Sequence, residues 1–189
     1  MENERLYEKV LSKKEVFKGI LVTVEQWEAE LCDGQHAMRE VIKHVGAAAV
    51  VPVDAQGNVT LVQQYRIALG RVLTEIPAGK KDSPDEDPLL CAQRELAEET
   101  GLRAANWQYL TTIDTSPGFL TERIGLYLAT ELTQGETHPD EDEYLNLVKM
   151  PLKEAVDRVM AGEFADAKTA TGLLMAWQIV SGKQEEGTC

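Results

Sequence analysis

The sequence is poor in cysteine and contains no long apolar run. Its three cysteines, Cys32, Cys91 and Cys189, lie far apart, so they lack the short paired spacing of a zinc site or a redox motif. No segment approaches the length of a membrane-spanning helix, and the charged first ten residues are not followed by an apolar signal core. We therefore expect reduced thiols, no membrane partner and a cytoplasmic location.

Basic and aromatic residues are also scarce. The chain has 19 Lys and Arg against 32 Asp and Glu, a net charge of -13, which repels the phosphate backbone of DNA or RNA. We therefore expect no nucleic-acid partner. An acidic protein that handles an anionic small molecule needs clustered Arg or Lys, a bound divalent cation, or both. The 189 residues are 43% hydrophobic, 27% charged and only 6% aromatic, as in one globular domain.

The first half of the chain carries strand signals. Residues Val16 to Val24 alternate and are rich in β-branched side chains, which predicts a strand paired with Gln26 to Leu31. Two denser apolar runs, VGAAAVVPV and VTLVQQYR, flank a Gly57-Asn58 turn signal. This pattern predicts a hairpin and marks the first strong contribution to the core.

A helix is signalled between Pro88 and Thr100. A strand ending near Ile76 and a polar loop from Pro77 precede it, and Asp87-Pro88 supplies an N-cap followed by proline at the first helical position. Gly101 then ends the helix as a C-terminal glycine.

The second half alternates strand-like and helical patterns. Strands are expected at Trp107 to Ile113, Ile124 to Leu132 and Tyr144 to Met150, and one helix is expected from Pro151. A last helix, capped by Asp166, would place one apolar face toward the core: Ala170, Leu173, Leu174, Trp177 and Val180. The final GKQEEGTC is expected to be disordered. This mixture predicts a mixed sheet packed between helices.

Three carboxylates share one stripe of the helix from Pro88. At about 100° per residue, Glu98 lies about 60° to one side of Glu95 and Glu99 about 40° to the other. The acids repel one another at this spacing, and a hard divalent ion such as Mg²⁺ or Mn²⁺ would remove the conflict. A bare Glu-x-x-Glu-Glu pattern is more often a solvated helix face. The surrounding residues therefore decide between a solvated face and an ion site.

Those surroundings resemble the Nudix box, whose pattern is Gly, five residues, Glu, seven residues, then Arg-Glu-aliphatic-x-Glu-Glu-x-Gly-aliphatic. The stretch from Arg94 to Leu102 matches completely, and Glu86 lies seven residues before Arg94. Six residues rather than five separate Glu86 from Gly79. The insertion leaves Asp85 and Glu86 as alternatives for the first acid of the box.

The resemblance points to the ADP-ribose pyrophosphatase branch. It implies an α/β/α Nudix sandwich with a mixed β-sheet and an N-terminal β extension, usually a homodimer. The implied division is residues 1–44 as a dimerisation extension, 45–183 as the hydrolase domain and 184–189 as a tail. Four features outside the box support it: Arg39-Glu40, Gln64-Tyr65-Arg66, Glu75 to Gly79, and Ser116-Pro117-Gly118-Phe119, with Pro117 at the branch's marker proline.

The resemblance also assigns ion-binding and catalytic roles. The backbone carbonyl of Ala78 and the side chains of Glu95 and Glu99 would bind Mg²⁺ or Mn²⁺, and Glu98 would do so directly or through water. Arg94 would hold these acids in place. A late acidic loop would supply the general base, with Glu143 first and Glu141 second. Glu98 competes with both, and the loop could also be merely a solvated charged run.

Substrate contacts are expected from Arg39, Arg66, Glu75, Pro117 and Phe119. The two arginines would meet the phosphates, although isolated arginines are usually surface residues. Phe119 could stack on a base or simply fill a core or dimer interface, and Glu75 would orient a loop or a ribose.

The reaction implied by the resemblance is hydrolysis of ADP-ribose or a similar nucleoside-diphosphate sugar to a nucleoside monophosphate and a sugar phosphate. A GDP-mannose or other sugar-nucleotide pyrophosphatase is the alternative within the same chemistry. A non-catalytic nucleotide sensor is the alternative from another class. It is disfavoured because all three acids of the helix are present.

Overall fold

The computed structural model describes residues 4–135 and 144–186. The chain forms two compact units. The first unit comprises Met1–Gly46 and Asp114–Arg123, and the second comprises Ala47–Ile113 and Ile124–Cys189. Within the described ranges, no helix is long and apolar enough to cross a membrane.

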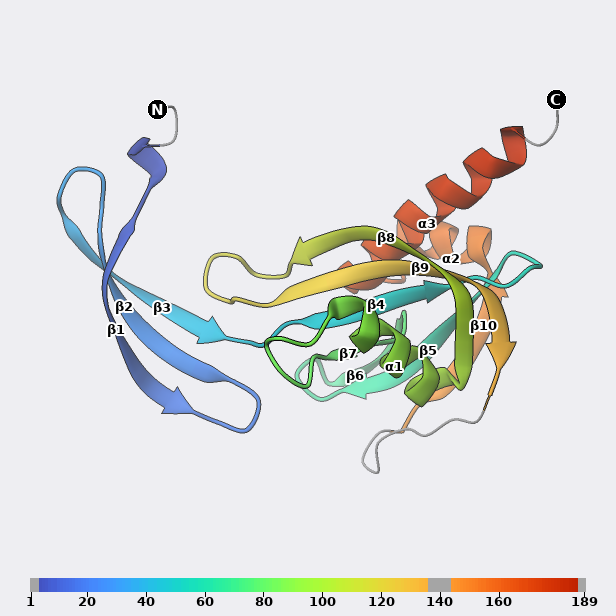
Figure 1. Cartoon of the computed structure of the whole chain (residues 1–189), viewed down its shortest axis with the longest axis horizontal. Helices are drawn as coiled ribbons and strands as arrows, with labels where there is room; N and C mark the ends of the chain where they lie inside the picture. The colour runs from blue at the N-terminus through green and yellow to red at the C-terminus, as the bar shows by residue number, and fades with distance from the viewer. Residues whose placement is uncertain (1–3, 136–143, 187–189) are drawn as a thin grey trace. The chain divides into compact units, whose positions relative to one another are not determined.

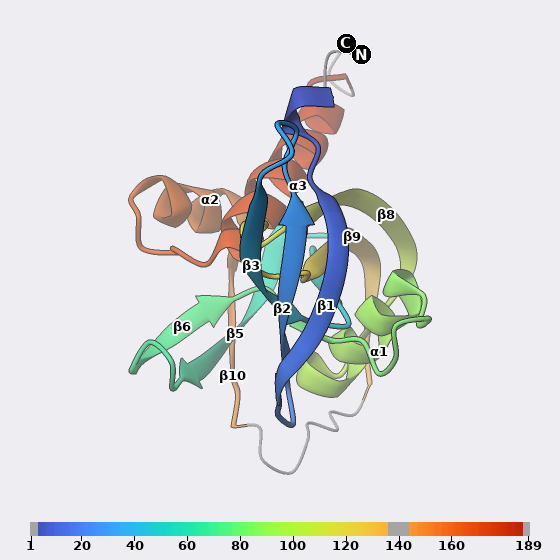
Figure 2. The same ribbon diagram turned by 90° about the vertical axis from the view of Figure 1, so that its left-hand side faces the viewer.

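The first unit is a three-stranded antiparallel sheet in the order β1-β2-β3, seen face-on in Figure 2. Its strands are β1 (Lys9–Lys18), β2 (Thr23–Glu30) and β3 (His36–Lys43), preceded by the 3-10 turn η1 (Glu4–Leu6). The segment from Asp114 to Arg123 joins this unit through β3, because Ile42 N donates to Phe119 O at 2.7 Å and Thr121 N to Ile42 O at 3.0 Å.

The strand predicted from Val16 to Val24 is wrong in its bounds. This range covers the end of β1, a turn, and the start of β2. Gly19 N donates to Val22 O at 2.9 Å and closes the turn. Two register irregularities in β1, at Val10/Ser12 and Glu15/Phe17, interrupt the two-residue alternation from which strand bounds are inferred.

The second unit contains two sheets. One has the order β7-β4-β9-β8 and the other β10-β5-β6. In the first, β4 pairs antiparallel with β7 and parallel with β9. The strand bounds are β4 (Ala47–Pro52), β5 (Asn58–Arg66), β6 (Arg71–Glu75), β7 (Ala78–Lys80), β8 (Leu102–Asp114), β9 (Arg123–Gln134) and β10 (Asn146–Pro151).

The predicted hairpin between the two apolar runs is also wrong. Both runs are strands, β4 and β5, but they belong to different sheets and are linked by an isolated bridge between Val53 and Val59. Every residue of β4 is buried and both of its edges already have partners, β7 and β9. β5 therefore pairs with β6 and β10 instead.

β4 lies at the centre of an α/β/α arrangement. Its alternate residues Ala48 and Val50 pack with side chains of α1 (Pro88–Thr100). Ala49 and Val51 belong to the largest core cluster, together with buried residues of α2 (Leu152–Met160) and α3 (Ala167–Glu186). Because successive strand residues point to opposite faces, the helices cover both sides of the strand. Figure 1 shows α1 in green apart from α2 and α3 in orange and red. The predicted α/β class is confirmed.

The helix predicted at Pro88 to Thr100 is confirmed at both ends. Asp87 Oδ1 accepts a hydrogen bond from Leu89 N at 2.7 Å, and Pro88 occupies the first turn. Gly101 closes the helix in the left-handed region, with φ 70°. Ala92 and Leu96 are fully buried, so this side of the helix packs on the core.

The C-terminal helix forms as predicted after Asp166, with one error in its buried face. Leu174 is 37% exposed, whereas Ala176 is fully buried. A Cβ on Gly172 would lie 3.0 Å from both Ile76 Cδ1 and Val51 Cγ2. This close approach turns Gly172 and its neighbours toward the core, which displaces Leu174 from it. The helix also continues to Glu186, into the stretch expected to be disordered.

Candidate ion and diphosphate site

The three carboxylates of α1 lie beside β7, a short strand that pairs with the buried strand β4. β7 pairs with β4 through Ala49 and Ala78, and through Ala48 and Gly79. α1 packs on the same strand, with Cys91 and Ala92 clustered against Ala48. One buried strand therefore places both the β7 backbone and the acidic helix.

Two of the carboxylates contact β7 directly. Ala78 N donates to Glu99 Oε2 at 3.0 Å. A Cβ added to Gly79 would lie 2.0 Å from Glu95 Cδ, so the Glu95 carboxylate occupies the space that any side chain at position 79 would need. Three of the four predicted ion-binding residues, Ala78, Glu95 and Glu99, are thus brought together.

The Cys91 thiol also holds β7 against the helix. Its Sγ donates to Gly79 O at 3.6 Å. Burial, together with the nearby charges of Glu95 and Glu86, raises the pKa of Cys91 to about 12, so the thiol keeps the proton that this contact uses. Cys91 is a structural side chain of this site.

Arg94 lies among the acids, as an orienting residue must. Its Nη1 donates to Glu95 Oε1 at 2.7 Å and to Glu98 Oε2 at 3.0 Å, and its Nη2 donates to Lys80 O at 3.1 Å. Burial alone would lower the pKa of Arg94, but the charge and hydrogen bond of Glu95 raise it above its ordinary value. The guanidinium therefore stays charged and compensates the carboxylates around it.

The loop before α1 brings Glu86, rather than Asp85, to this cluster. Glu86 Oε1 lies 3.5 Å from Arg94 Nε, and Glu86 Oε2 accepts from Asp82 N at 2.6 Å. Asp85 is exposed. The inserted residue is taken up within the loop, so it does not displace the first acid from the helix.

The donor chemistry of this cluster fits a hard divalent ion. The acidic side chains of the cluster offer carboxylate oxygens, the donors that such an ion prefers. Glu95 and Glu99 are only 9% and 6% exposed. As the described residues stand, no three His, Cys, Asp or Glu side chains converge closely enough to hold an ion. Arg94 draws Glu95 and Glu98 to its own Nη1, while Glu99 accepts from Ala78 N. Glu98 is the most exposed of the three acids, with a side chain that is 36% exposed.

A second charged cluster surrounds Glu75, which is 1% exposed. Arg66 binds it in a bidentate manner, with Nε to Oε1 and Nη2 to Oε2 both at 2.8 Å, and Lys168 Nζ also donates to Oε2. Burial would raise the pKa of Glu75, but the hydrogen bond from Arg66 and the charge of Lys168 lower it to about 2. Two predicted substrate-binding residues, Arg66 and Glu75, are therefore brought together.

Lys168, Asp166 and Thr169 belong to this cluster but were not predicted as site residues. Asp166 Oδ2 accepts from Lys168 Nζ and Thr169 N, each at 3.0 Å, and from Thr169 Oγ1 at 2.6 Å. The sequence offered one signal, a lysine next to the helix cap in a chain that needs local positive charge. The contact itself cannot be read from the sequence, because Glu75 and Lys168 are 93 positions apart.

Three other predicted substrate-binding residues lie in the first unit. Arg39 pairs with Glu8, Nε to Oε2 at 3.0 Å and Nη2 to Oε1 at 2.7 Å. Pro117 lies in the turn in which Ser116 O accepts from Phe119 N at 3.1 Å, and Phe119 is 51% exposed. Each of these roles remains a prediction.

Of the three predicted general bases, the structure describes one, Glu98. Glu141 and Glu143 lie outside the described residues. Glu98 lies on α1 with its carboxylate on Arg94, as described above. The assignment of the general base remains a prediction.

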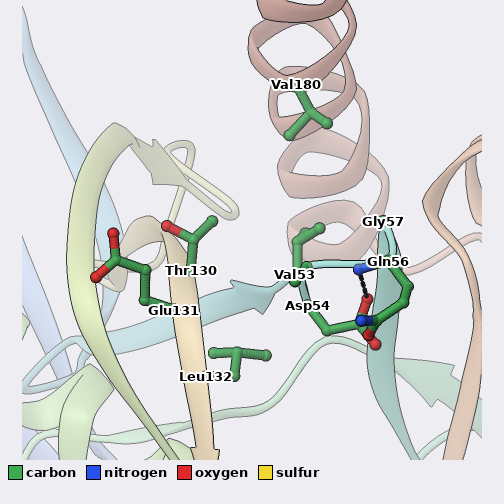
Figure 3. A pocket seen from close by; sticks show the side chains of 9 residues that line it. Val53, Asp54, Gln56, Gly57, Thr130, Glu131, Leu132 and Val180 are labelled. Atoms are coloured by element: carbon green, nitrogen blue, oxygen red, sulfur yellow. Dashed lines mark hydrogen bonds between the residues drawn. The ribbon is translucent and has the colours of Figure 1, made fainter.

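A pocket elsewhere in the second unit has a volume of about 440 Å³. It lies at the end of β4 between the Val53 to Gly57 turn, Thr130 to Leu132 of β9 and Val180 of α3 (Figure 3). It shares no residue with the acidic cluster. Asp54 within it is already bound by Lys149, Asn58 and Gln56 N, and these contacts lower its pKa to about 2 against the effect of burial. Its lining contains two carboxylates, Asp54 and Glu131, and none of the acids of α1.

Comparison with known proteins identifies the family. The NUDIX domain family matches residues 43–173, so the chain belongs to the Nudix family. The match includes β7, α1 and the Glu75 cluster. Nudix hydrolases generally use divalent metal ions, in agreement with the donor set described above.

Relatives of stated activity cover most of the chain. An ADP-ribose pyrophosphatase of Mycobacterium tuberculosis (strain ATCC 25618 / H37Rv) is 37% identical over 175 residues, 91% of this chain and 84% of that protein. One of Bacillus subtilis (strain 168) is 39% identical over 167 residues, 87% and 90%. A crystal structure of an ADP compounds hydrolase superposes with a TM-score of 0.82 at 23% identity, covering 93% of this chain and 95% of that one, and shares the fold.

Substitution of Gly79 by alanine tests the contact between β7 and α1. The new Cβ would overlap the Glu95 carboxylate, which must then leave its position. We expect Gly79→Ala to weaken Mn²⁺ binding by about 10- to 100-fold, measured by titration with electron paramagnetic resonance. Gly182→Ala is the control, because a Cβ there meets no atom within 4 Å. Unchanged Mn²⁺ affinity in Gly79→Ala would contradict the assigned site.

Replacement of Glu75 by glutamine tests the buried charge cluster. A carboxylate whose pKa falls from 4.5 to about 2 stabilises the fold above pH 4.5, by about 3 kcal/mol, and loses this contribution as the pH falls toward 2. Glu75→Gln should therefore lower the free energy of unfolding at pH 7, and the difference from the wild type should shrink at pH 3. Urea unfolding at both pH values measures this, with exposed Glu163→Gln as the control. A difference that stays constant with pH would refute the ionised Glu75.

Proposed function

We propose that the protein hydrolyses the diphosphate bond of ADP-ribose or a similar nucleoside-diphosphate sugar, releasing a nucleoside monophosphate and a sugar phosphate. Mg²⁺ is the proposed ion, with Mn²⁺ as a substitute. The observation that carries the proposal is the contact of Glu95 and Glu99 with Gly79 and Ala78, which concentrates buried carboxylate oxygen beside the backbone of β7. The names of the two relatives at 37% and 39% identity supply the substrate class.

The chain's own residues divide the work in this proposal. Ala78 O, Glu95 and Glu99 hold the ion, and Glu98 completes the set or activates water. A bound divalent ion supplies positive charge to the diphosphate and lowers the pKa of an attacking water. Arg66 donates through Nε and Nη2 to Glu75. Its Nη1 has no partner among the described residues, and its side chain is 39% exposed. That remaining donor can bind a phosphate oxygen.

GDP-mannose and other sugar nucleotides are the alternative substrates within the same chemistry. A GDP-mannose pyrophosphatase of Cronobacter sakazakii (strain ATCC BAA-894) is 30% identical over 176 residues, less than the ADP-ribose pyrophosphatases. A small-molecule substrate also suits the net charge of -13 better than a nucleic acid or an anionic membrane does. Cytoplasmic location is part of the same proposal.

A homodimer formed through the first unit is the proposed assembly, with residues 1–44 as the dimerisation extension. Every residue of β1 is exposed, and the exposed apolar side chains include Phe17 at 57% and Leu21 at 63%. A sheet with this much uncovered apolar surface is unusual for a monomer.

Product analysis tests the reaction. The purified protein is incubated with Mg²⁺ and a panel containing ADP-ribose, GDP-mannose and UDP-glucose, and mass spectrometry identifies the products. A nucleoside monophosphate and a sugar phosphate from ADP-ribose are expected. No monophosphate from any compound would refute the proposal, and nucleotide binding that persists in EDTA without turnover would favour a sensor.

Glutamine substitutions test the acidic helix. Glu98→Gln and Glu99→Gln should each lower kcat by about 100-fold or more, since each removes a charge that the ion or the attacking water requires. Glu98→Gln should leave the melting temperature almost unchanged, because its side chain is partly exposed. Glu154→Gln is the matched control, a helical glutamate that also pairs with an arginine four residues away. Wild-type kcat in both variants would refute the site.

Sedimentation velocity tests the assembly. The wild type is expected to sediment as a dimer, and Phe17→Glu combined with Leu21→Glu to shift it toward a monomer, because charge replaces exposed apolar surface. Met160→Glu, which changes a side chain 74% exposed on α2, is the control. A monomeric wild type would contradict this part of the proposal.

A further inference from the structure

The start of α3 contains a lysine that is almost completely buried. Lys168 is 9% exposed, and its Nζ donates to Glu75 Oε2 and, at 3.0 Å, to Asp166 Oδ2. A lysine loses much hydration on burial and is rarely enclosed unless it is paired. Its position opposite Glu75 therefore needs an explanation other than solubility or surface charge.

Thr169, the next residue, holds the backbone that follows Glu75. It is fully buried, its Oγ1 donates to Asp166 Oδ2 at 2.6 Å, and the same oxygen accepts from Ile76 N at 3.0 Å. Both capacities of the hydroxyl are thus used. One hydroxyl connects the helix cap to a peptide group 93 residues earlier in the chain.

Gly172 adds a third contact at the same place. A Cβ at this position would lie 3.0 Å from Ile76 Cδ1, so α3 approaches Ile76 more closely than a side chain there would comfortably permit. Glu75 is therefore held through its side chain, and Ile76 through both its backbone and its side chain. All three contacts come from the first turns of α3.

Two residues beyond Ile76, the chain enters strand β7. Ala78 N bonds to Glu99 there, and Gly79 lies against Glu95. On the other side, Glu75 holds two donors of the Arg66 guanidinium. The segment that α3 fixes is thus the link between the proposed ion ligands and the proposed phosphate-binding arginine.

We propose that Lys168 and Thr169 are positioning residues for the reaction. Lys168 holds Glu75 so that Arg66 presents its remaining donor to the substrate diphosphate, and Thr169 holds Ile76 so that strand β7 meets the carboxylates of α1. The inference rests on the proposed function, and it assigns the two residues to different steps. Lys168 serves substrate binding and Thr169 serves ion binding.

A purely stabilising role predicts something different. Two residues that only stabilise the fold would, when replaced, lower the melting temperature and affect ion and substrate binding alike. Positioning predicts a separation, in which each substitution changes one binding constant and leaves the other close to its wild-type value.

The Lys168 half is tested with Lys168→Met, which keeps the length of the side chain and removes its charge. The KM for ADP-ribose and the Kd for its non-cleavable α,β-methylene analogue should rise about tenfold or more, while the Mn²⁺ affinity changes by less than about twofold. Lys153→Met is the control, because it removes an exposed ion pair with Asp157 on α2. Lys168→Met with wild-type KM and Kd would overturn this half.

A double substitution keeps this half testable if Lys168→Met folds poorly. Replacing Glu75 as well neutralises the buried carboxylate through which Lys168 is proposed to act, and a residue that acts through Glu75 has no further effect once Glu75 is neutral. Glu75→Gln with Lys168→Met should therefore bind the methylene analogue as Glu75→Gln does alone. Additive losses in the double variant would show that Lys168 does not act through Glu75.

The Thr169 half is tested without substrate. Thr169→Val keeps the shape and removes the hydroxyl, and it should weaken Mn²⁺ binding about tenfold or more, while Thr169→Ser restores it. Wild-type Mn²⁺ affinity in Thr169→Val, or failure of serine to restore it, would overturn this half. A wild-type protein that cleaves no compound of the panel would refute the proposed function and the Lys168 half, whereas Mn²⁺ binding alone decides the Thr169 half.

Discussion

The candidate site depends on one constraint, that each carboxylate enclosed by the second unit must have its charge compensated. Glu75 and Glu99 are 1% and 6% exposed, and an unpaired charge at such positions would cost several kcal/mol. Glu75 is compensated by Arg66 and Lys168, and Glu99 accepts from the Ala78 amide. These bonds connect α1, β5, β6, β7 and α3, so the same interactions that make burial tolerable also determine where the site residues lie.

The charge balance explains why an ion is needed at all. Arg94 faces Glu95, Glu98 and Glu86, and the two cations beside Glu75 are matched by Glu75 itself and Asp166. The basic side chains of the site thus form ion pairs with its own acids, in a chain with a net charge of -13. A diphosphate would meet little uncompensated positive potential here, so a divalent cation has to provide it.

Local signals in the sequence were sufficient for α1 and for its acidic stripe. The Asp87 cap, Pro88 and Gly101 act within a few residues of the helix that they delimit, and helical geometry alone relates Glu95 to Glu99. The partners of β4 and β5 were not predictable in this way, because an apolar run shows that a strand is buried and not which strand lies beside it. Lys168 is the extreme case, since its role depends on a contact 93 residues away.

This separation in sequence has a consequence for how the site is assembled. The turn of α1 that carries the acids can form from local interactions, but the peptide at Ile76 is held by Thr169, which arrives only when α3 packs on the core. At the proposed site, ion binding would therefore require the complete second unit rather than the acidic helix alone. Because an ion that binds the folded state and not the unfolded one stabilises the fold by mass action, the site and the core reinforce each other. The arrangement links the chemistry of one helical turn to the cooperativity of the whole unit.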